Sequence, residues 1–265
     1  MRRRRQEAAH AEADLAQEEA MLTAALGREL ESDTPADRAA ARASTLARVE
    51  YTYGTLRTAA DLTHVIRAWR DRIPGASSLW PAVDAHSDHV RGDPSADAVI
   101  VEYGDYQCSE CAEAHALYGR VQGWLDDGRL CAAFRHFPLV DAHPFALRAA
   151  QAAEAAAAQG RFWEMNDELM HYTVATDDDH QEHVLLKGPH DDGQLEQVAG
   201  RAGLDLERFR ADIDSPVALK HILEDFRNGL ASGVNGTPTF YVNGHRADVG
   251  GVDELYAQIA GLVVT

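Results

Sequence analysis

The feature that most restricts the fold of this chain is a pair of cysteines, Cys108 and Cys111, separated by two residues. The pair follows a short apolar run rich in β-branched residues, 98–101, which predicts a buried strand. The residues after it, 110–124, have the apolar spacing of a helix. The sequence therefore predicts a strand that leads through a short loop into a helix, with both thiols at the helix start.

Thiols at the start of a helix are suited to redox chemistry. The first N–H groups of a helix are unpaired and carry roughly half a positive charge. A thiolate there is stabilised, so its pKa falls below the free value of about 8.5. The spacing also puts the second sulfur one helical turn away, where it can attack a mixed disulfide. We expect Cys108 to be the exposed nucleophile and Cys111 the shielded resolving thiol.

A pair of this kind is also half of a zinc site, which needs two further ligands. The third cysteine, Cys131, lies on a predicted strand and is expected to be a small buried apolar residue. His115 follows the pair on the same predicted helix and could join a site. A polar stretch rich in Asp and His, 177–190, has no fixed ligand spacing, and we assign no role to His86 or His89. We therefore predict no metal and no cofactor.

Composition and charge restrict the partners and the location. The formal net charge of −18 makes nucleic acid an improbable partner, because phosphate contacts need clustered Lys and Arg. Four arginines follow Met1, but the apolar run of a secretory signal is absent after them, and no run approaches the ~20 apolar residues of a membrane span. We expect a cytoplasmic protein, a compartment in which a Cys-x-x-Cys pair usually means redox or metal chemistry.

The remainder of the chain separates into two predicted regions. Residues 1–80 carry apolar stripes at helical spacing and predict an N-terminal helical extension. Residues 86–265 predict a domain. Its expected elements after the first helix are a strand at 130–134, an Ala-rich helical stretch at 144–170, further helices at 195–202, 206–213 and 217–230, a strand at 239–242, a tight turn at 243–244 and a last helix at 253–262.

Four segments of this domain resemble the DsbA-like thioredoxin-fold family. They are the cysteine segment 101–111 (VEYGDYQCSEC), the strand and turn at 134–139 (FRHFPL) with 143–144 (HP), the segment 160–165 (GRFWEM) and the loop 233–240 (GVNGTPTF). The resemblance spans residues 86–262. It implies an α/β thioredoxin-like fold with a helical insertion, about residues 143–230, between the second strand and the strand of the cis-proline loop, preceded by the N-terminal helical extension.

The resemblance also implies roles for three further residues. Pro238 would follow a cis peptide bond and face the cysteines. Thr237 would offer its backbone to an extended substrate segment. Glu102 occupies the position of a buried acid beneath the resolving cysteine, where it would accept a proton. Because an apolar strand precedes Glu102, we favour burial over a place on the surface.

One residue departs from the strongly oxidising relatives, which carry a His or another non-acidic residue before the second cysteine. Here that residue is Glu110. A carboxylate about 6 Å from a sulfur costs the thiolate about 0.7 kcal/mol at water-like dielectric and about 3 kcal/mol at an effective dielectric near 20. The shift opposes the helix dipole. Glu110 thus predicts a protein that is less oxidising than those relatives.

The sequence therefore predicts a thiol–disulfide oxidoreductase that exchanges a Cys108–Cys111 dithiol or disulfide with protein or low-molecular-weight thiol substrates. Two alternatives stay open. One is a thioredoxin-like binding module that recruits a partner through its N-terminal helices. The other is a carrier of metal or thiol groups on the two cysteines.

Overall fold

The computed structural model describes residues 78–174, 188–189 and 191–263. The helices that the sequence predicts between residues 7 and 73, and the three histidines of the stretch 177–190, lie outside these residues. The residues just before the predicted domain pack on it: Ser78 forms a β-bridge with His245, and the Trp80 N–H donates to the hydroxyl of Ser232.

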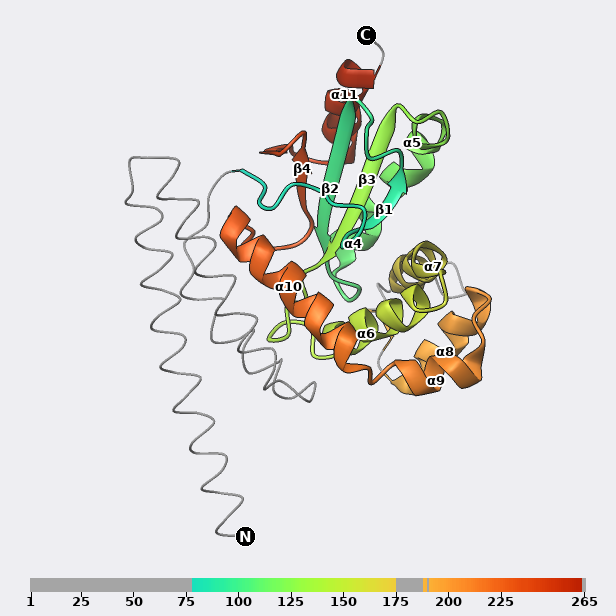
Figure 1. The fold of residues 1–265 in the computed structure, drawn as a ribbon. Coiled ribbons are helices and arrows are strands. Elements are labelled where there is room, and N and C mark those ends of the chain that lie inside the picture. Colours follow the sequence, from blue (N-terminus) through green and yellow to red (C-terminus); the bar gives the residue numbers. More distant parts are fainter. Residues whose placement is uncertain (1–77, 175–187, 190, 264–265) are drawn as a thin grey trace, which may run out of the picture. The chain divides into compact units, whose positions relative to one another are not determined.

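The described residues form a sheet with helices on both faces (Figure 1). The strands are β1 (His89–Gly92), β2 (Ala98–Gly104), β3 (Leu130–His136), β4 (Thr239–Val242) and β5 (His245–Arg246). The helices are α4 (Ser109–Ala114), α5 (Ala116–Asp126), α6 (Ala146–Ala157), α7 (Phe162–Val174), α8 (Asp192–Arg201), α9 (Leu206–Asp212), α10 (Pro216–Ser232) and α11 (Val252–Val263).

The strand order in the sheet is β1-β3-β2-β4-β5. β2 and β3 are parallel and are joined by the crossover through α4 and α5, whereas β1 pairs antiparallel with β3 and β4 antiparallel with β2. The central strand β2 thus carries the cysteine loop at its end and has β4, which follows the proline loop, as its neighbour. This is the predicted thioredoxin-like fold, with α6 to α10 inserted between β3 and β4.

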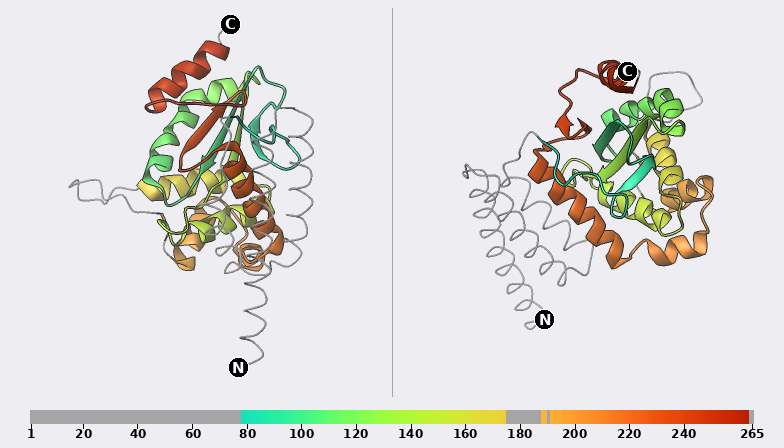
Figure 2. Two further views of the ribbon diagram at one scale, coloured as in Figure 1. Left: turned by 90° about the vertical axis from the view of Figure 1, so that its left-hand side faces the viewer. Right: turned by 45° about the horizontal axis from the view of Figure 1, so that its top comes forward.

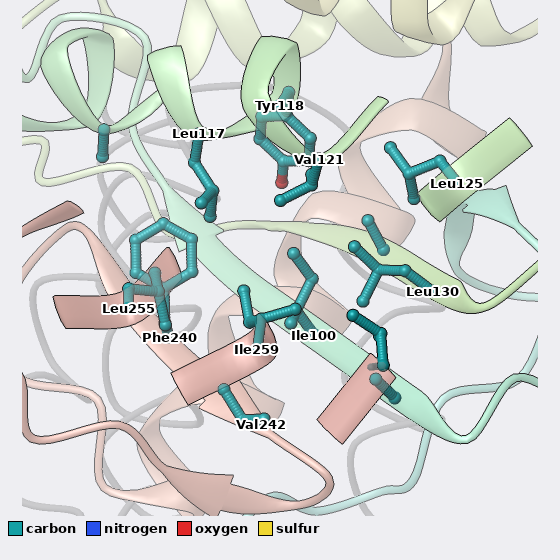
Figure 3. Close-up of a cluster of buried hydrophobic side chains, with 14 residues drawn as sticks. Ile100, Leu117, Tyr118, Val121, Leu125, Leu130, Phe240, Val242, Leu255 and Ile259 are labelled. Carbon is teal, nitrogen blue, oxygen red and sulfur yellow. The ribbon is translucent and has the colours of Figure 1, made fainter. Parts of the chain in front are cut away.

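An apolar core lies between the sheet and the pair α5 and α11, which Figure 2 shows side by side on one face. In Figure 3, Ile100 of β2 and Phe240 of β4 meet Leu117 and Val121 of α5 and Ile259 of α11. On the opposite face, α10 approaches so closely that a Cβ on Gly229 would lie 2.7 Å from the Phe137 ring. Helices thus cover both faces of the sheet.

The alternation of side chains along β2 decides the position of Glu102. Ala98 and Ile100 both belong to the core beneath α5. Because successive strand residues point to opposite faces, Glu102 continues this row and points toward the same helices. Its side chain is fully buried, as the sequence predicts.

Helix α10 delivers the chain to the proline loop, and its ends follow sequence signals. The Ser215 hydroxyl accepts a hydrogen bond from the Val217 N–H, and Pro216 occupies the first helical position. Gly233 ends the helix at φ +92°, a left-handed conformation that favours glycine. The loop to Pro238 begins there.

The structure differs from the sequence-based prediction at three places. The helix predicted at 110–124 is two helices that meet at His115, and the stretch 144–170 is also two, since Gly160 at φ +70° follows α6. Strand β1 was not predicted. Its segment has no apolar alternation, and its Arg91 instead pairs with Asp167.

Candidate active site

The two segments that carry the predicted site residues meet because β2 and β4 are neighbours. Tyr103 of β2 is opposite Thr239 of β4. The residues after β2 therefore lie beside the residues before β4, and Cys108 comes next to Thr237. The Thr237–Pro238 peptide bond is cis, the geometry that the family resemblance implies.

The Cys108 sulfur is enclosed rather than exposed, which corrects the sequence-based expectation. Cys108 is the N-cap residue of α4, without a capping hydrogen bond from its side chain, and it is 3% exposed. Its sulfur lies 3.3 Å from the carbonyl oxygen of Thr237 and 3.3 Å from Oε2 of Glu110, and its single proton can be donated to either oxygen. The exposure was mispredicted because the cover comes from a loop 129 residues away in sequence.

The pKa of Cys108 lies below its ordinary value. The largest cause is a hydrogen bond to its sulfur from the Cys111 thiol, and burial acts in the opposite direction. Helix α4 itself has six residues before the break at His115. The backbone N–H of Cys111, in the first turn of this helix, lowers the pKa of Cys108 further.

The resolving cysteine has the opposite electrostatic character. Cys111 is fully buried, and burial raises the pKa of its thiol well above the ordinary value, with further contributions from Cys108 and Glu102. The two thiols are free. The pair therefore combines one sulfur that ionises easily with one that needs a base before it can react.

Glu102 is the group with the properties of that base. Burial raises its pKa to about 8, while a hydrogen bond from Tyr118 to Oε2, 2.8 Å long, lowers it. The negative charge of Cys108 raises it further. The other carboxylate oxygen, Oε1, is buried without a hydrogen-bond partner among the described residues. Glu102 is therefore a buried carboxyl group whose raised pKa is coupled to the thiols of Cys108 and Cys111. Tyr118 was not predicted from the sequence.

Glu110 lies on the outer side of the pair, and its carboxylate is held in place. It accepts hydrogen bonds from the Ser109 hydroxyl at 2.9 Å and from Cys108. Its own backbone N–H is the largest cause that lowers its pKa. As an ionised acceptor, it raises the pKa of Cys108, which is the direction that the sequence predicts.

Two polar residues before the cysteine hold the loop and were missed in the sequence. Oδ2 of Asp105 accepts from the Leu139 N–H at 2.7 Å and contacts Nδ1 of His143 at 2.8 Å. Oε1 of Gln107 accepts from the Phe145 N–H at 2.6 Å. Their position in the sequence, between a buried strand and the cysteines, was the signal that could have identified them.

The other candidate residues take structural positions. Cys131 is fully buried on β3, as predicted, and burial raises its pKa to about 11. Nε2 of His115 lies 3.2 Å from a carboxylate oxygen of Asp167.

A groove of about 630 Å³ lies next to helix α4 and the proline loop. Glu110 and Pro238 line one part of it, and residues 246–252 line another. The charged side chains along it are those of Glu110, Glu113, Arg246 and Asp248, so the groove is mainly acidic. Because it adjoins both Glu110 and the proline loop, it is suitable for a segment of substrate chain.

We expect brief alkylation of the reduced protein at pH 7 to label Cys108 at least tenfold faster than either other cysteine. The thiolate is the form that reacts, and the pKa is lowered for Cys108 but raised for Cys111 and Cys131. Peptide mass mapping after iodoacetamide treatment measures this. Faster labelling of Cys131 would contradict the assignment of the nucleophile.

Comparison with known proteins places this geometry in a family. The family model described as Thioredoxin matches residues 84–260. A curated relative, the Na(+)/H(+) antiporter NhaA 3 of Salinispora tropica, is 40% identical over 172 residues, which are 65% of this chain and 24% of that protein. The chain thus spans about a quarter of the curated relatives it matches. None of the described helices combines the length and the apolar character that a membrane crossing needs.

Solved structures give the same fold. BdbD from Bacillus subtilis aligns with a TM-score of 0.57 and 21% identity, over 72% of this chain and all of that one. A thioredoxin-like oxidoreductase from Silicibacter pomeroyi aligns with a TM-score of 0.51 and 26% identity, over 67% and 92% of the two chains. With a family model that matches two thirds of its residues and this DsbA-like architecture, the chain belongs to the thioredoxin family.

Proposed function

We propose that this protein catalyses thiol–disulfide exchange, with Cys108 and Cys111 cycling between dithiol and disulfide. The observation that carries the proposal is the contrast between the two sulfurs. The pKa is lowered for Cys108 and raised well above normal for the fully buried Cys111. Such a pair divides naturally into an attacking and a resolving thiol.

In the reducing direction, the Cys108 thiolate attacks a substrate disulfide. A mixed disulfide forms, and one substrate sulfur leaves as a thiolate. Glu102 then takes the proton of Cys111, and the resulting thiolate attacks the sulfur of Cys108 and releases the second substrate sulfur. Two electrons pass to the substrate, and the protein becomes the disulfide. The oxidising direction is the reverse of these steps.

The groove favours protein substrates with basic or neutral segments next to the reacting sulfur. Its charged lining is mainly acidic, and its free space continues from Glu110 and Pro238 toward the start of α11. Low-molecular-weight thiols fit the same chemistry. We propose a reductant-leaning poise because Glu110 raises the pKa of Cys108, and the cytoplasmic location stays a prediction.

The proposal is tested by equilibrating the full chain with reduced and oxidised glutathione and mapping its disulfides, together with an insulin-reduction assay. We expect a Cys108–Cys111 disulfide and catalysed reduction. The change Cys108→Ser should abolish both, and Cys131→Ser, which alters a cysteine of similar burial outside the pair, should change neither. A wild-type protein that forms no such disulfide, or activity that survives Cys108→Ser, would refute the exchange reaction.

A further inference from the structure

Three imidazole rings converge on one carboxylate oxygen beneath the sheet. Oε1 of Glu154, on α6, lies 2.6 Å from Nε2 of His89 and 2.8 Å from Nε2 of His136. It also lies 2.9 Å from Nδ1 of His221. The four residues come from β1, β3, α6 and α10, so the tertiary fold and not a local motif assembles them.

Packing holds the rings in this arrangement. The side chain of His136 is 1% exposed, and those of His89 and His221 are 14% and 18% exposed. His89 stacks on Phe162 with 3.5 Å between ring centroids. Nε2 of His221 faces the carboxylate of Asp225 at 3.8 Å. The ring nitrogens therefore already point toward Glu154, and the backbone does not have to move.

Hydrogen bonding alone is a poor explanation of this convergence. A carboxylate oxygen offers about two lone-pair positions, yet three ring nitrogens approach the same atom. None of the four residues takes part in the proposed exchange between the cysteines. Three imidazole nitrogens and one carboxylate oxygen, brought this close together, are in contrast the donor set of a four-coordinate metal site.

We propose that His89, His136, His221 and Glu154 bind a zinc ion. In a tetrahedral site with bonds of about 2.0–2.2 Å, neighbouring ligand atoms are roughly 3.3 Å apart. The ligand atoms of the first two histidines and Glu154 already lie within 4.8 Å of one another, so a rearrangement of the side-chain ends alone admits the ion. Imidazole nitrogens select zinc and similar transition metals over calcium or magnesium. Binding releases the protons that the ring nitrogens hold toward Glu154.

The experiment uses the full chain without a histidine tag, treated with chelator, and with Cys108→Ser and Cys111→Ser so that the thiols cannot bind the metal. Titration with Zn²⁺ in a calorimeter should give one ion per chain. Glu154→Gln and His136→Asn should each weaken binding at least tenfold. Zn²⁺ should raise the melting temperature of the parent protein and not that of the Glu154→Gln variant, because a ligand stabilises only the state that binds it.

Two controls separate this site from other histidines. His245→Asn changes an exposed histidine on β5, and His180→Asn with His183→Asn and His190→Asn removes the histidines of the stretch 177–190. Both proteins should bind zinc like the parent. If Glu154→Gln fails to fold, His221→Ala replaces the most exposed of the three rings and should weaken binding at least tenfold. The proposal would be overturned if the parent protein did not bind zinc. It would also be overturned if only the variant that lacks the histidines of the stretch 177–190 lost binding.

Discussion

Replacing Glu102 by Gln is expected to slow catalysed disulfide exchange about 100-fold, and the loss should fall on the step that resolves the mixed disulfide. Cys111 is fully buried, and its pKa is raised well above normal, so it needs a base. General acid–base assistance contributes about 100- to 10,000-fold in enzymes, and Gln cannot accept the proton. Quenched-flow analysis of the mixed disulfide should show it accumulating in the variant.

The same substitution should make the protein more stable, which separates a catalytic role from a structural one. The pKa of Glu102 in the folded protein, about 8, is above its ordinary 4.5. The unfolded chain therefore loses this proton first, and wild-type stability falls as the pH rises from about 4.5 to 8. At pH 7 the free energy of unfolding is lower by roughly 3 kcal/mol than at a pH where Glu102 is protonated in both states, at about 1.4 kcal/mol per pKa unit. Glu102→Gln should lack this pH dependence.

Urea unfolding of the reduced protein at pH 5.5, 7 and 8.5 measures the stability effect. Glu207→Gln, which changes an exposed carboxylate on α9, is the matched control and should behave like the wild type in both experiments. A Glu102→Gln protein with normal resolution kinetics would show that another group takes the proton. A variant less stable than the wild type at pH 8.5 would contradict the raised pKa.

The charge on Cys108 also controls when Glu102 can act as a base. The negative charge of Cys108 raises the pKa of Glu102. In the mixed disulfide, Cys108 carries no charge, so this contribution disappears and Glu102 ionises more readily. The base therefore becomes available at the step in which Cys111 must lose its proton.

The sequence predicted the strand that carries the site because local residue patterns determine that strand. The apolar run at 98–101 predicted β2, and its period of two explains the burial of Glu102. The family resemblance implied that Pro238 follows a cis peptide bond, which it does. The signal for β2 is local, whereas the signal for the proline loop is a family motif.

The features that were missed depend on contacts between distant segments. Cys108 is covered by Thr237, 129 residues away. The carboxylate of Glu154 joins His89 and His221 across 65 and 67 residues, and in sequence each of these is an ordinary polar residue. Strand β1 was missed because its polar side chains, such as Arg91, find partners on α7 in place of an apolar alternation.

Removing the charge at residue 110 is expected to make the protein more oxidising. The Glu110 carboxylate lies 3.3 Å from the Cys108 sulfur, about half the separation assumed from the sequence. Two charges at that distance repel by about 1.3 kcal/mol at water-like dielectric. We use this dielectric because Glu110 is exposed and can turn away from a thiolate. The repulsion destabilises the reduced form, which carries the thiolate, and so lowers the reduction potential.

Both Glu110→Gln and Glu110→His should therefore lower the pKa of Cys108 by about 1 unit and raise the reduction potential by roughly 25 mV at a pH where Cys108 is ionised. Glutathione redox titrations measure the potential, and thiolate absorbance against pH measures the pKa. Glu113→Gln removes an exposed carboxylate one turn further along α4 and is the matched control, with an expected change below 10 mV. An unchanged or more negative potential in both Glu110 variants would mean that this carboxylate does not set the redox poise, and the proposed reductant-leaning poise would then lose its electrostatic basis.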